Sequence, residues 1–321
     1  MPKFKVAVTD GIFSSYQEEQ KVLAEVDCAV EIYKLSSEEE AIETLKDVDG
    51  ILLNLLQISA KVIKSMKKCR IISRYGIGFD NVDIEAATNA GIWVANVPDY
   101  AFEDVSDHAL ALLLAAVRKI AYKDRLIRKG SWNLHGRQKC YRIKDKILGL
   151  IGYGSIAQAL HRKISGFGLA KVLVYDPFID REYIRDSGGV PCDLDTLLKE
   201  SDYVSIHAPL TKGTRRMIGA KQISLMKTEA ILVNTSRGPL INEKALASAL
   251  KDKRIAYAGL DVFEEEPLPK DSSLRKTDNI VLSDHTAWYT EESIVELKTK
   301  AAQNISEVLK GEKPVYPLNN V

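Results

Sequence analysis

The 321-residue sequence lacks the features that mark several classes of protein. Its cysteines (Cys28, Cys69, Cys140 and Cys192) are scattered without a C-x-x-C pair, which argues against a disulfide scaffold or a cysteine metal site. The net charge is only +1, so we expect neither nucleic acid nor a membrane surface as a partner. The longest apolar run, residues 109–117, is too short to span a bilayer. We expect a soluble, cytoplasmic protein without a bound metal.

The overall composition is that of an ordinary globular protein, with 45% hydrophobic and 28% charged residues. A chain of this length can form two domains with separate cores. The first residues, MPKFKVAVTD, lead directly into a strand-like segment, and we therefore expect no signal peptide.

The strongest local pattern lies in residues 146–177. A short apolar run is followed by GYGSIA, which fits G-x-G-x-x-G/A, and then by a segment with helical apolar spacing. Gly152 allows a tight turn, Gly154 lets the backbone approach a pyrophosphate, and the small Ala157 lets helix and strand pack closely. The helix N-terminus would then face the phosphates. The alternative is a strand–helix turn with a purely structural role.

A second apolar run ends on Asp176, at about the distance from the glycines where a carboxylate accepts from the adenosine ribose 2′-OH. No arginine follows it directly, because Pro177 and Phe178 come next. The pattern therefore predicts a dinucleotide site and favours NAD over NADP.

Strand and helix signals alternate on both sides of this stretch, which predicts parallel, doubly wound sheets in two α/β lobes. The first series of predicted strands is 5–8, 30–33, 50–53, 70–73 and 93–95, with helices that include 38–46, 60–67 and 84–89. The second series continues from 147–151 and 172–175 through 203–206, 230–234, 256–260 and 280–282. A final helix over 291–309 is expected to return the chain to the first lobe, with the tail 313–321 extended against it.

A single long helix is predicted over residues 102–129, between the two series. Acidic residues stand in its first turn, basic residues near its end, and Gly130 follows as a possible left-handed cap. Its apolar middle predicts burial between the lobes or in a subunit interface. His108 within it is predicted to be a hydrogen-bonded structural histidine rather than a ligand.

Three later strands are each followed by residues that could do chemistry. Arg237 follows one strand, the acidic stretch 261–267 the next, and His285 the last. Singly, each could be a solvated charge, a polar loop or an ordinary strand-end histidine. Together with a dinucleotide site they suit hydride transfer at a 2-hydroxy acid. A guanidinium grips a carboxylate, an imidazole exchanges the hydroxyl proton, and a neighbouring carboxylate holds the imidazole.

The whole chain resembles the NAD-dependent D-2-hydroxyacid dehydrogenases. This family includes D-3-phosphoglycerate dehydrogenase, glycerate and formate dehydrogenases, and the C-terminal-binding-protein corepressors. The resemblance is carried by SRYGIGFDNVDI (73–84), NVPDYAFEDVSDHALALLLA (96–115), RKGSWN (128–133), LGLIGYGSIA (148–157), YDP (175–177), VSIHAPLTKGTRRMI (204–218), ISLMKTEAILVNTSRGPLI (223–241), LDVFEEEP (260–267) and DHTAWYTEES (284–293).

The resemblance implies a flavodoxin-like substrate domain of residues 1–98 plus 289–321 and a Rossmann NAD-binding domain of residues 99–288. It assigns Arg237 to the substrate carboxylate and carbonyl, His285 to acid–base catalysis and Glu266 to orienting His285. It implies that substrate also meets the backbone N–H groups of Tyr75, Gly76, Ile77 and Gly78. The implied NAD contacts are Gly152, Tyr153, Gly154, Ser155, Ile156, Asp176, Ala208, Pro209, Thr214, Thr235 and Asp261.

The sequence departs from the family pattern beside the acid–base histidine. Asp284 places an extra acid next to it, with an effect that depends on geometry. Trp288, in an AWY stretch that resembles the corepressor branch, either lines the substrate site or packs in the core. At the site, its indole would favour an apolar or thioether-bearing 2-oxo acid. Because the chain ends soon after the final helix, we expect no C-terminal regulatory domain.

The leading hypothesis is an NAD-dependent dehydrogenase that interconverts a small D-2-hydroxy acid and its 2-oxo acid. The resemblance implies a homodimer that uses the long helix near 102–129. The alternative is a dinucleotide-sensing, dimerising scaffold, like the corepressors, with little or no turnover. Formate oxidation is disfavoured by Glu266, because that reaction needs no proton transfer by a Glu–His pair.

Overall fold

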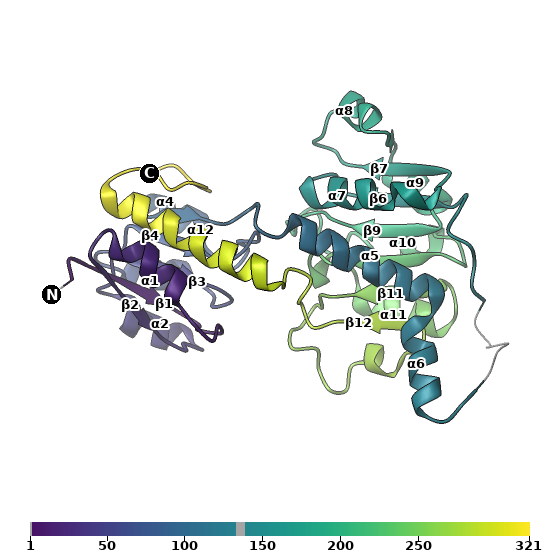
Figure 1. Cartoon of the computed structure of the whole chain (residues 1–321), viewed down its shortest axis with the longest axis horizontal. Coiled ribbons are helices and arrows are strands. Elements are labelled where there is room, and N and C mark those ends of the chain that lie inside the picture. The colour runs from purple at the N-terminus through teal and green to yellow at the C-terminus, as the bar shows by residue number, and fades with distance from the viewer. Residues whose placement is uncertain (1, 133–138) are drawn as a thin grey trace. The chain divides into compact units, whose positions relative to one another are not determined.

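The computed structural model describes residues 2–132 and 139–321, so Asn133 of the RKGSWN stretch lies outside the described residues. The chain forms two compact units, Met1–Ala101 with Thr290–Val321 and Phe102–Tyr289 (Figure 1). The elements of the first unit are β1 (Phe4–Val8), α1 (Gln17–Ala24), β2 (Cys28–Ile32), α2 (Glu38–Leu45), β3 (Gly50–Leu53), α3 (Ala60–Ser65), β4 (Ile71–Arg74), α4 (Ile84–Asn89), β5 (Trp93–Ala95) and α12 (Glu291–Lys310).

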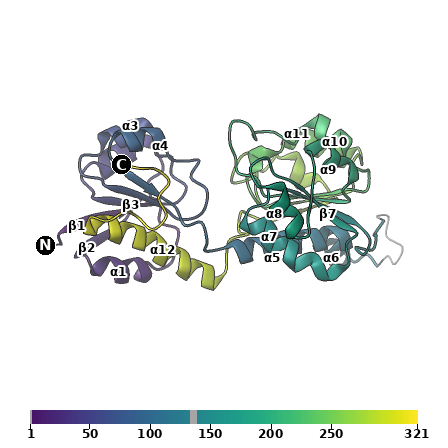
Figure 2. The ribbon, with the colours of Figure 1, turned by 90° about the horizontal axis from the view of Figure 1, so that it is seen from above.

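The first unit is a parallel five-stranded sheet in the order β2-β1-β3-β4-β5, the flavodoxin-like order. Helices α1 and α12 cover one face and α3 and α4 the other (Figure 2). The returning α12 is fixed by the Ser73 hydroxyl, which donates to the carbonyl of Ala301 at 2.8 Å. The C-terminal tail lies along β5, where the Leu318 N–H donates to Val94 O at 2.8 Å.

The second unit contains a parallel seven-stranded sheet in the order β12-β11-β10-β9-β6-β7-β8. Its elements are α5 (Phe102–Arg118), α6 (Ile120–Arg128), β6 (Ile147–Ile151), α7 (Ser155–Ile164), η1 (Ser165–Phe167), β7 (Lys171–Tyr175), α8 (Arg181–Asp186), β8 (Val190–Pro191), α9 (Leu194–Glu200), β9 (Tyr203–Ile206), α10 (Ala220–Leu225), β10 (Ile231–Asn234), η2 (Gly238–Leu240), α11 (Glu243–Lys251), β11 (Tyr257–Leu260), η3 (Ser273–Lys276) and β12 (Ile280–Leu282).

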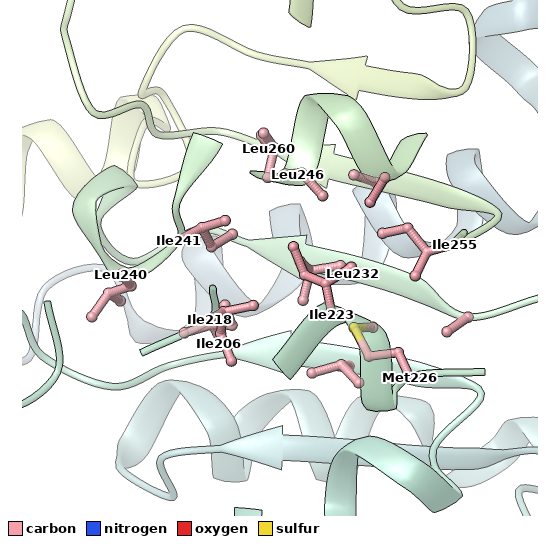
Figure 3. Close-up of a cluster of buried hydrophobic side chains, with 14 of the residues drawn as sticks. Ile206, Ile218, Ile223, Met226, Leu232, Leu240, Ile241, Leu246, Ile255 and Leu260 are labelled. Carbon is pink, nitrogen blue, oxygen red and sulfur yellow. The ribbon is translucent and has the colours of Figure 1, made fainter. Parts of the chain in front are cut away.

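This strand order is that of a Rossmann sheet, and it reverses between β6 and β9. Helices α9, α10 and α11 cover one face, and α5, α6 and α7 lie on the other (Figure 2). Under α10 and α11 a continuous apolar cluster includes Ile206, Leu232 and Leu246, all fully buried (Figure 3). The central strands β9, β10 and β11 are buried along their whole length, which explains their largely apolar sequences. The prediction of two doubly wound α/β lobes is confirmed.

The prediction of one helix over residues 102–129 was wrong. The chain breaks between α5 and α6 at Lys119, which has φ +59° in the left-handed region. This conformation places the Lys119 amine 4.2 Å from the ring centroid of Tyr257, and burial lowers its pKa to about 8. Lysine favours helices, so no local pattern predicted the break. Helix α5 packs on the sheet of its own unit, with the Leu112 Cβ 3.0 Å from an ideal Cβ built on Gly259.

Within residues 2–132 and 139–321, no helix is long and apolar enough to cross a membrane. The same residues contain no group of three or more His, Cys, Asp or Glu side chains that could hold a metal ion.

Candidate active site

The predicted site residues of the second unit all follow the carboxyl ends of parallel strands. Ligands of open α/β sheets bind at this edge, near the point where the strand order reverses. The residues concerned are Gly152–Ile156 after β6, Asp176 after β7, Ala208, Pro209 and Thr214 after β9, Thr235 and Arg237 after β10, Asp261 and Glu266 after β11, and His285 after β12.

The glycine loop after β6 has the geometry that its sequence predicts. Gly152 has φ +86°, and a Cβ on it would lie 2.8 Å from the backbone nitrogen of Ala208. Only glycine fits this close approach to the loop after β9. A Cβ on Gly154 would meet no atom within 4 Å, so the backbone there is open to a ligand. Helix α7 begins directly afterwards at Ser155.

Tyr153 points away from this loop into the core. Its side chain is buried, and its hydroxyl lies 2.7 Å from His161 Nδ1 on α7. Burial raises the pKa of Tyr153 and lowers the pKa of His161, so both groups are neutral at physiological pH. The pair fastens the loop to the helix. Tyr153 therefore offers a ligand its backbone rather than its phenol.

Asp176 is held in place by backbone donors. Its Oδ2 accepts from the N–H of Tyr153 at 2.8 Å, and its Oδ1 accepts from Phe178 and Ile179 at 2.8 and 3.2 Å. These bonds keep the carboxylate at the end of β7, beside the glycine loop. The loop after β9 is closed similarly, because the Thr214 hydroxyl donates to Pro209 O at 2.6 Å.

The turn after β10 carries Arg237. The Asn234 amide donates to Arg237 O at 2.9 Å, and the Arg237 guanidinium donates to Ser236 O at 2.8 Å. Gly238 brings this turn against the loop after β11, since a Cβ on Gly238 would lie 1.8 Å from the carbonyl carbon of Phe263. The turn that bears Arg237 can thus lie directly against the acidic loop, because Gly238 has no side chain at the point of contact.

His285 and Glu266 form a close pair. His285 Nδ1 lies 2.6 Å from Glu266 Oε2, while the other carboxylate oxygen accepts from the Phe263 N–H at 2.9 Å. Burial raises the pKa of Glu266, but the bond to His285, the Phe263 N–H and the charge of Arg237 outweigh it and leave this pKa below the usual value. The carboxylate is therefore ionised at neutral pH and can accept the Nδ1 proton of His285. The opposite ring nitrogen, Nε2, is left to exchange a proton with a ligand.

Asp261 organises the turn that carries His285. The Asp261 side chain is fully buried and accepts from the backbone N–H groups of Thr286 at 3.1 Å and Ala287 at 3.0 Å. Its backbone carbonyl accepts from the His285 N–H at 2.8 Å. These bonds hold His285 at φ +61°, which is uncommon for a residue with a side chain.

Asp284 and Trp288, which depart from the family pattern, both lie in the turn that carries His285. Asp284 is exposed and accepts from the Thr286 hydroxyl at 2.9 Å rather than contacting the imidazole. The half-buried Trp288 indole donates from Nε1 to the carbonyl of His285 at 2.9 Å. Trp288 thus braces the turn that carries His285.

In the first unit, residues 75–78 form the loop after β4. The Tyr75 N–H donates to Leu53 O at 2.7 Å, and its buried phenol donates to Glu19 Oε1 at 2.8 Å. Gly76 has φ +124°. In the described part of the chain, the N–H groups of Gly76, Ile77 and Gly78 have no hydrogen-bond acceptor. The three residues therefore present a row of free backbone donors that suits an anion.

Comparison with known proteins agrees with this geometry. Residues 110–287 match the family described as D-isomer specific 2-hydroxyacid dehydrogenase, NAD binding domain. The chain belongs to the D-2-hydroxyacid dehydrogenases. It is 40% identical over 287 residues to a glyoxylate reductase of Korarchaeum cryptofilum, which covers 88% of this chain and 86% of that protein.

Other members of the D-2-hydroxyacid dehydrogenases are also similar. A D-3-phosphoglycerate dehydrogenase of Methanocaldococcus jannaschii is 40% identical over 311 residues, 96% of this chain but 58% of that protein. A crystal structure of Aquifex aeolicus D-lactate dehydrogenase, complexed with NAD and lactic acid, superposes with a TM-score of 0.86 at 28% identity and covers 96% of each chain. The predicted family resemblance is confirmed.

The residues of this site fit the NAD of the family at two points. The open space above Gly154 leaves room for a pyrophosphate. Thr235 Oγ1 is buried and forms no hydrogen bond with any described residue, so a polar ligand group could use it. Both positions lie at the carboxyl edge of the sheet.

Two further residues, His108 and Ser283, lie at this edge of the sheet although no sequence pattern indicated them there. His108 Nε2 on α5 lies 2.8 Å from Ser283 Oγ and 3.4 Å from Asp261 Oδ1. The prediction of a hydrogen-bonded histidine is confirmed, but its position beside the candidate site was not foreseen. The sequence carries no signal for it, because α5 is distant along the chain from β12.

Proposed function

We propose that the protein is an NAD-dependent D-2-hydroxyacid dehydrogenase that acts chiefly as a reductase of small 2-oxo acids. The observation that supports this most directly is the 2.6 Å pair of His285 and Glu266, with the charge of Arg237 beside it. The three groups follow the ends of the neighbouring strands β10, β11 and β12, and the glycine loop follows β6 at the same carboxyl edge of this parallel sheet.

Each group has a distinct role in the proposed reaction. Arg237 binds the substrate carboxylate and polarises its neighbouring carbonyl. His285 donates the proton of Nε2 to the carbonyl oxygen as that oxygen becomes a hydroxyl. Glu266 accepts from Nδ1, fixes the ring orientation and stabilises the imidazolium. NADH, when bound, supplies the hydride.

The proposed NAD contacts are those assigned from the family pattern: the glycine loop Gly152–Ile156, Asp176, the loop of Ala208, Pro209 and Thr214, and Thr235 with Asp261. The position of Asp176 suits a ribose hydroxyl and disfavours a 2′-phosphate by charge. We further propose that residues 1–98 with 289–321 bind substrate, through the donors of Gly76, Ile77 and Gly78, and that residues 99–288 bind NAD.

Glyoxylate is the first substrate to test, because similar proteins of Korarchaeum cryptofilum and Thermococcus litoralis are named glyoxylate reductases. The bracing of the His285 turn by Trp288 also places an indole next to the reacting groups. An apolar or thioether-bearing 2-oxo acid is therefore the second substrate class.

The test is NADH oxidation with glyoxylate, hydroxypyruvate, pyruvate and 4-methylthio-2-oxobutyrate. His285→Ala should lower kcat roughly 10²–10⁴-fold while NADH binding persists. Asp284→Asn, at the exposed neighbouring position, is the matched control and should keep activity. If wild type binds NADH but reduces none of these acids faster than the His285→Ala variant does, the protein is instead a dinucleotide-sensing scaffold.

We infer that the protein is a homodimer in which α6 contributes to the contact. No α6 side chain is fully buried, and Ile120, Ile127 and the following Trp132 are 58%, 51% and 80% exposed. Such an apolar surface is typical of a protein interface. Light scattering after gel filtration should give a dimer mass, and Ile127→Glu should shift the mass towards the monomer.

A further inference from the structure

A second histidine, His108, belongs to the same hydrogen-bond network as the turn that carries His285. His108 Nε2 lies 2.8 Å from Ser283 Oγ, and Ser283 Oγ lies 2.7 Å from Asp261 Oδ1. The three residues come from α5, from the position after β12 and from the position after β11.

The direction of these hydrogen bonds follows from the number of protons available. Both oxygens of Asp261 accept from backbone N–H groups, Oδ1 from Thr286 and Oδ2 from Ala287, so the proton between Ser283 and Asp261 is that of the Ser283 hydroxyl. The Ser283 oxygen can then only accept from His108. His108 must therefore carry its proton on Nε2, whether the ring is neutral or charged.

The hydrogen bonds from His108 to Ser283 and from Ser283 to Asp261 end at a buried carboxylate. Asp261 is 0% exposed and accepts from Ser283, Thr286 and Ala287, which lie on both sides of His285. His108 Nε2, whose proton is donated to Ser283, also lies 3.4 Å from Asp261 Oδ1. Without the His108 donor, the Ser283 hydroxyl would be free to rotate away from Asp261.

We propose that His108 is a positioning residue for the acid–base histidine. By donating from Nε2 to Ser283, it keeps the Ser283 hydroxyl directed at Asp261 and so holds the 283–287 turn with His285 at φ +61°. The inference rests on the proposed function, in which His285 transfers the proton. His108 itself contacts neither substrate nor the reacting atoms.

Two amide substitutions separate this role from simple packing. In His108→Gln the amide nitrogen occupies about the position of Nε2 and can donate to Ser283. In His108→Asn the amide ends near the position of Nδ1 and cannot reach Ser283. Both variants have the same polarity, so a difference between them reports the Nε2 donor.

The experiment measures kcat, KM, NADH affinity by fluorescence, and hydrogen–deuterium exchange of the 283–287 backbone amides. His108→Asn and Ser283→Ala should each lower kcat about tenfold, as expected for the loss of one hydrogen bond that orients a catalytic group. At NADH concentrations that saturate each variant, KM for the 2-oxo acid should stay near wild type, and exchange of the 283–287 amides should accelerate. His108→Gln should restore most of kcat and of the exchange protection.

A double variant tests whether His108 acts through Ser283. His108→Asn combined with Ser283→Ala should be no slower than either single variant, because both remove the same link. Asp107→Asn, the exposed neighbour of His108 on α5, controls for disturbance of the helix and should keep wild-type kcat.

Wild-type kcat in His108→Asn, equal losses in His108→Asn and His108→Gln, or additive losses in the double variant would each overturn the inference. The proposed function is tested separately. If His285→Ala turns over as fast as wild type, the proposed function fails. If His285→Ala is inactive while His108→Asn is unaffected, only the positioning role fails.

Discussion

Gly238 and Phe263 approach so closely that a Cβ on the glycine would lie 1.8 Å from the phenylalanine carbonyl carbon. Through this contact the turn bearing Arg237 packs backbone to backbone against the loop that leads to Glu266. The arrangement of the candidate active site therefore depends on a residue without a side chain.

Gly238→Ala should disturb both stability and activity. The added methyl group forces two loops apart, and overpacking of this kind typically costs about 1–3 kcal/mol. We expect a lower free energy of unfolding by urea titration and a lower kcat/KM. Gly166→Ala is the control, because a Cβ there meets no atom within 4 Å. Equal stability of the two variants would contradict the prediction.

Glu266→Gln should lower kcat on the order of 10²-fold, because the amide no longer stabilises the His285 imidazolium. Measurement of NADH oxidation at saturating 2-oxo acid tests this, with Glu265→Gln on the same loop as the control. Glu266→Gln activity equal to that of the control would exclude the assigned role.

The pH dependence of stability provides a separate check on Glu266. Its pKa is below the ordinary value of 4.5, so its ionised form stabilises the folded state. This contribution is fully present above pH 4.5 and is lost as the pH falls through the lowered folded-state pKa. The unfolding free energies of wild type and Glu266→Gln should therefore converge in acid, and a constant difference would contradict the assignment.

Asp176→Ala should weaken NADH binding by about tenfold, the typical loss when a hydrogen bond to a charged group is removed. NADPH binding should weaken less or improve, because the repulsion of a 2′-phosphate is also removed. Fluorescence titration with both nucleotides gives the ratio of the two affinities. An unchanged ratio would show that Asp176 does not select the cofactor.

Tyr75→Phe should affect stability rather than substrate binding. The phenol is buried and donates to Glu19, and burial raises the pKa of Tyr75 well above its usual value. Loss of this bond leaves the buried Glu19 carboxyl short of a donor, at a cost of about 1–3 kcal/mol. Thermal unfolding should show the loss while KM for the 2-oxo acid is unchanged. A raised KM at unchanged stability would mean that the phenol meets substrate.

Local sequence was sufficient for much of the fold. Apolar runs and helical spacing predicted two parallel α/β sheets, because a strand buried on both faces must be apolar throughout. The glycines at 152 and 154 predicted the loop after β6, since close backbone approach admits no side chain. Arg237 and His285 could be predicted as site residues because the carboxyl ends of parallel strands lie at one edge of the sheet.

Tertiary structure alone decided the rest. Lys119, whose left-handed backbone divides α5 from α6, places its amine over the ring of Tyr257. No local pattern encodes a contact between residues so far apart in the sequence. The partnership of His108 and Ser283 joins residues 175 positions apart. Sequence fixes local conformation through the backbone preferences of each residue. Which donors surround a buried carboxylate such as Asp261 depends on how whole elements pack, and only the folded chain determines it.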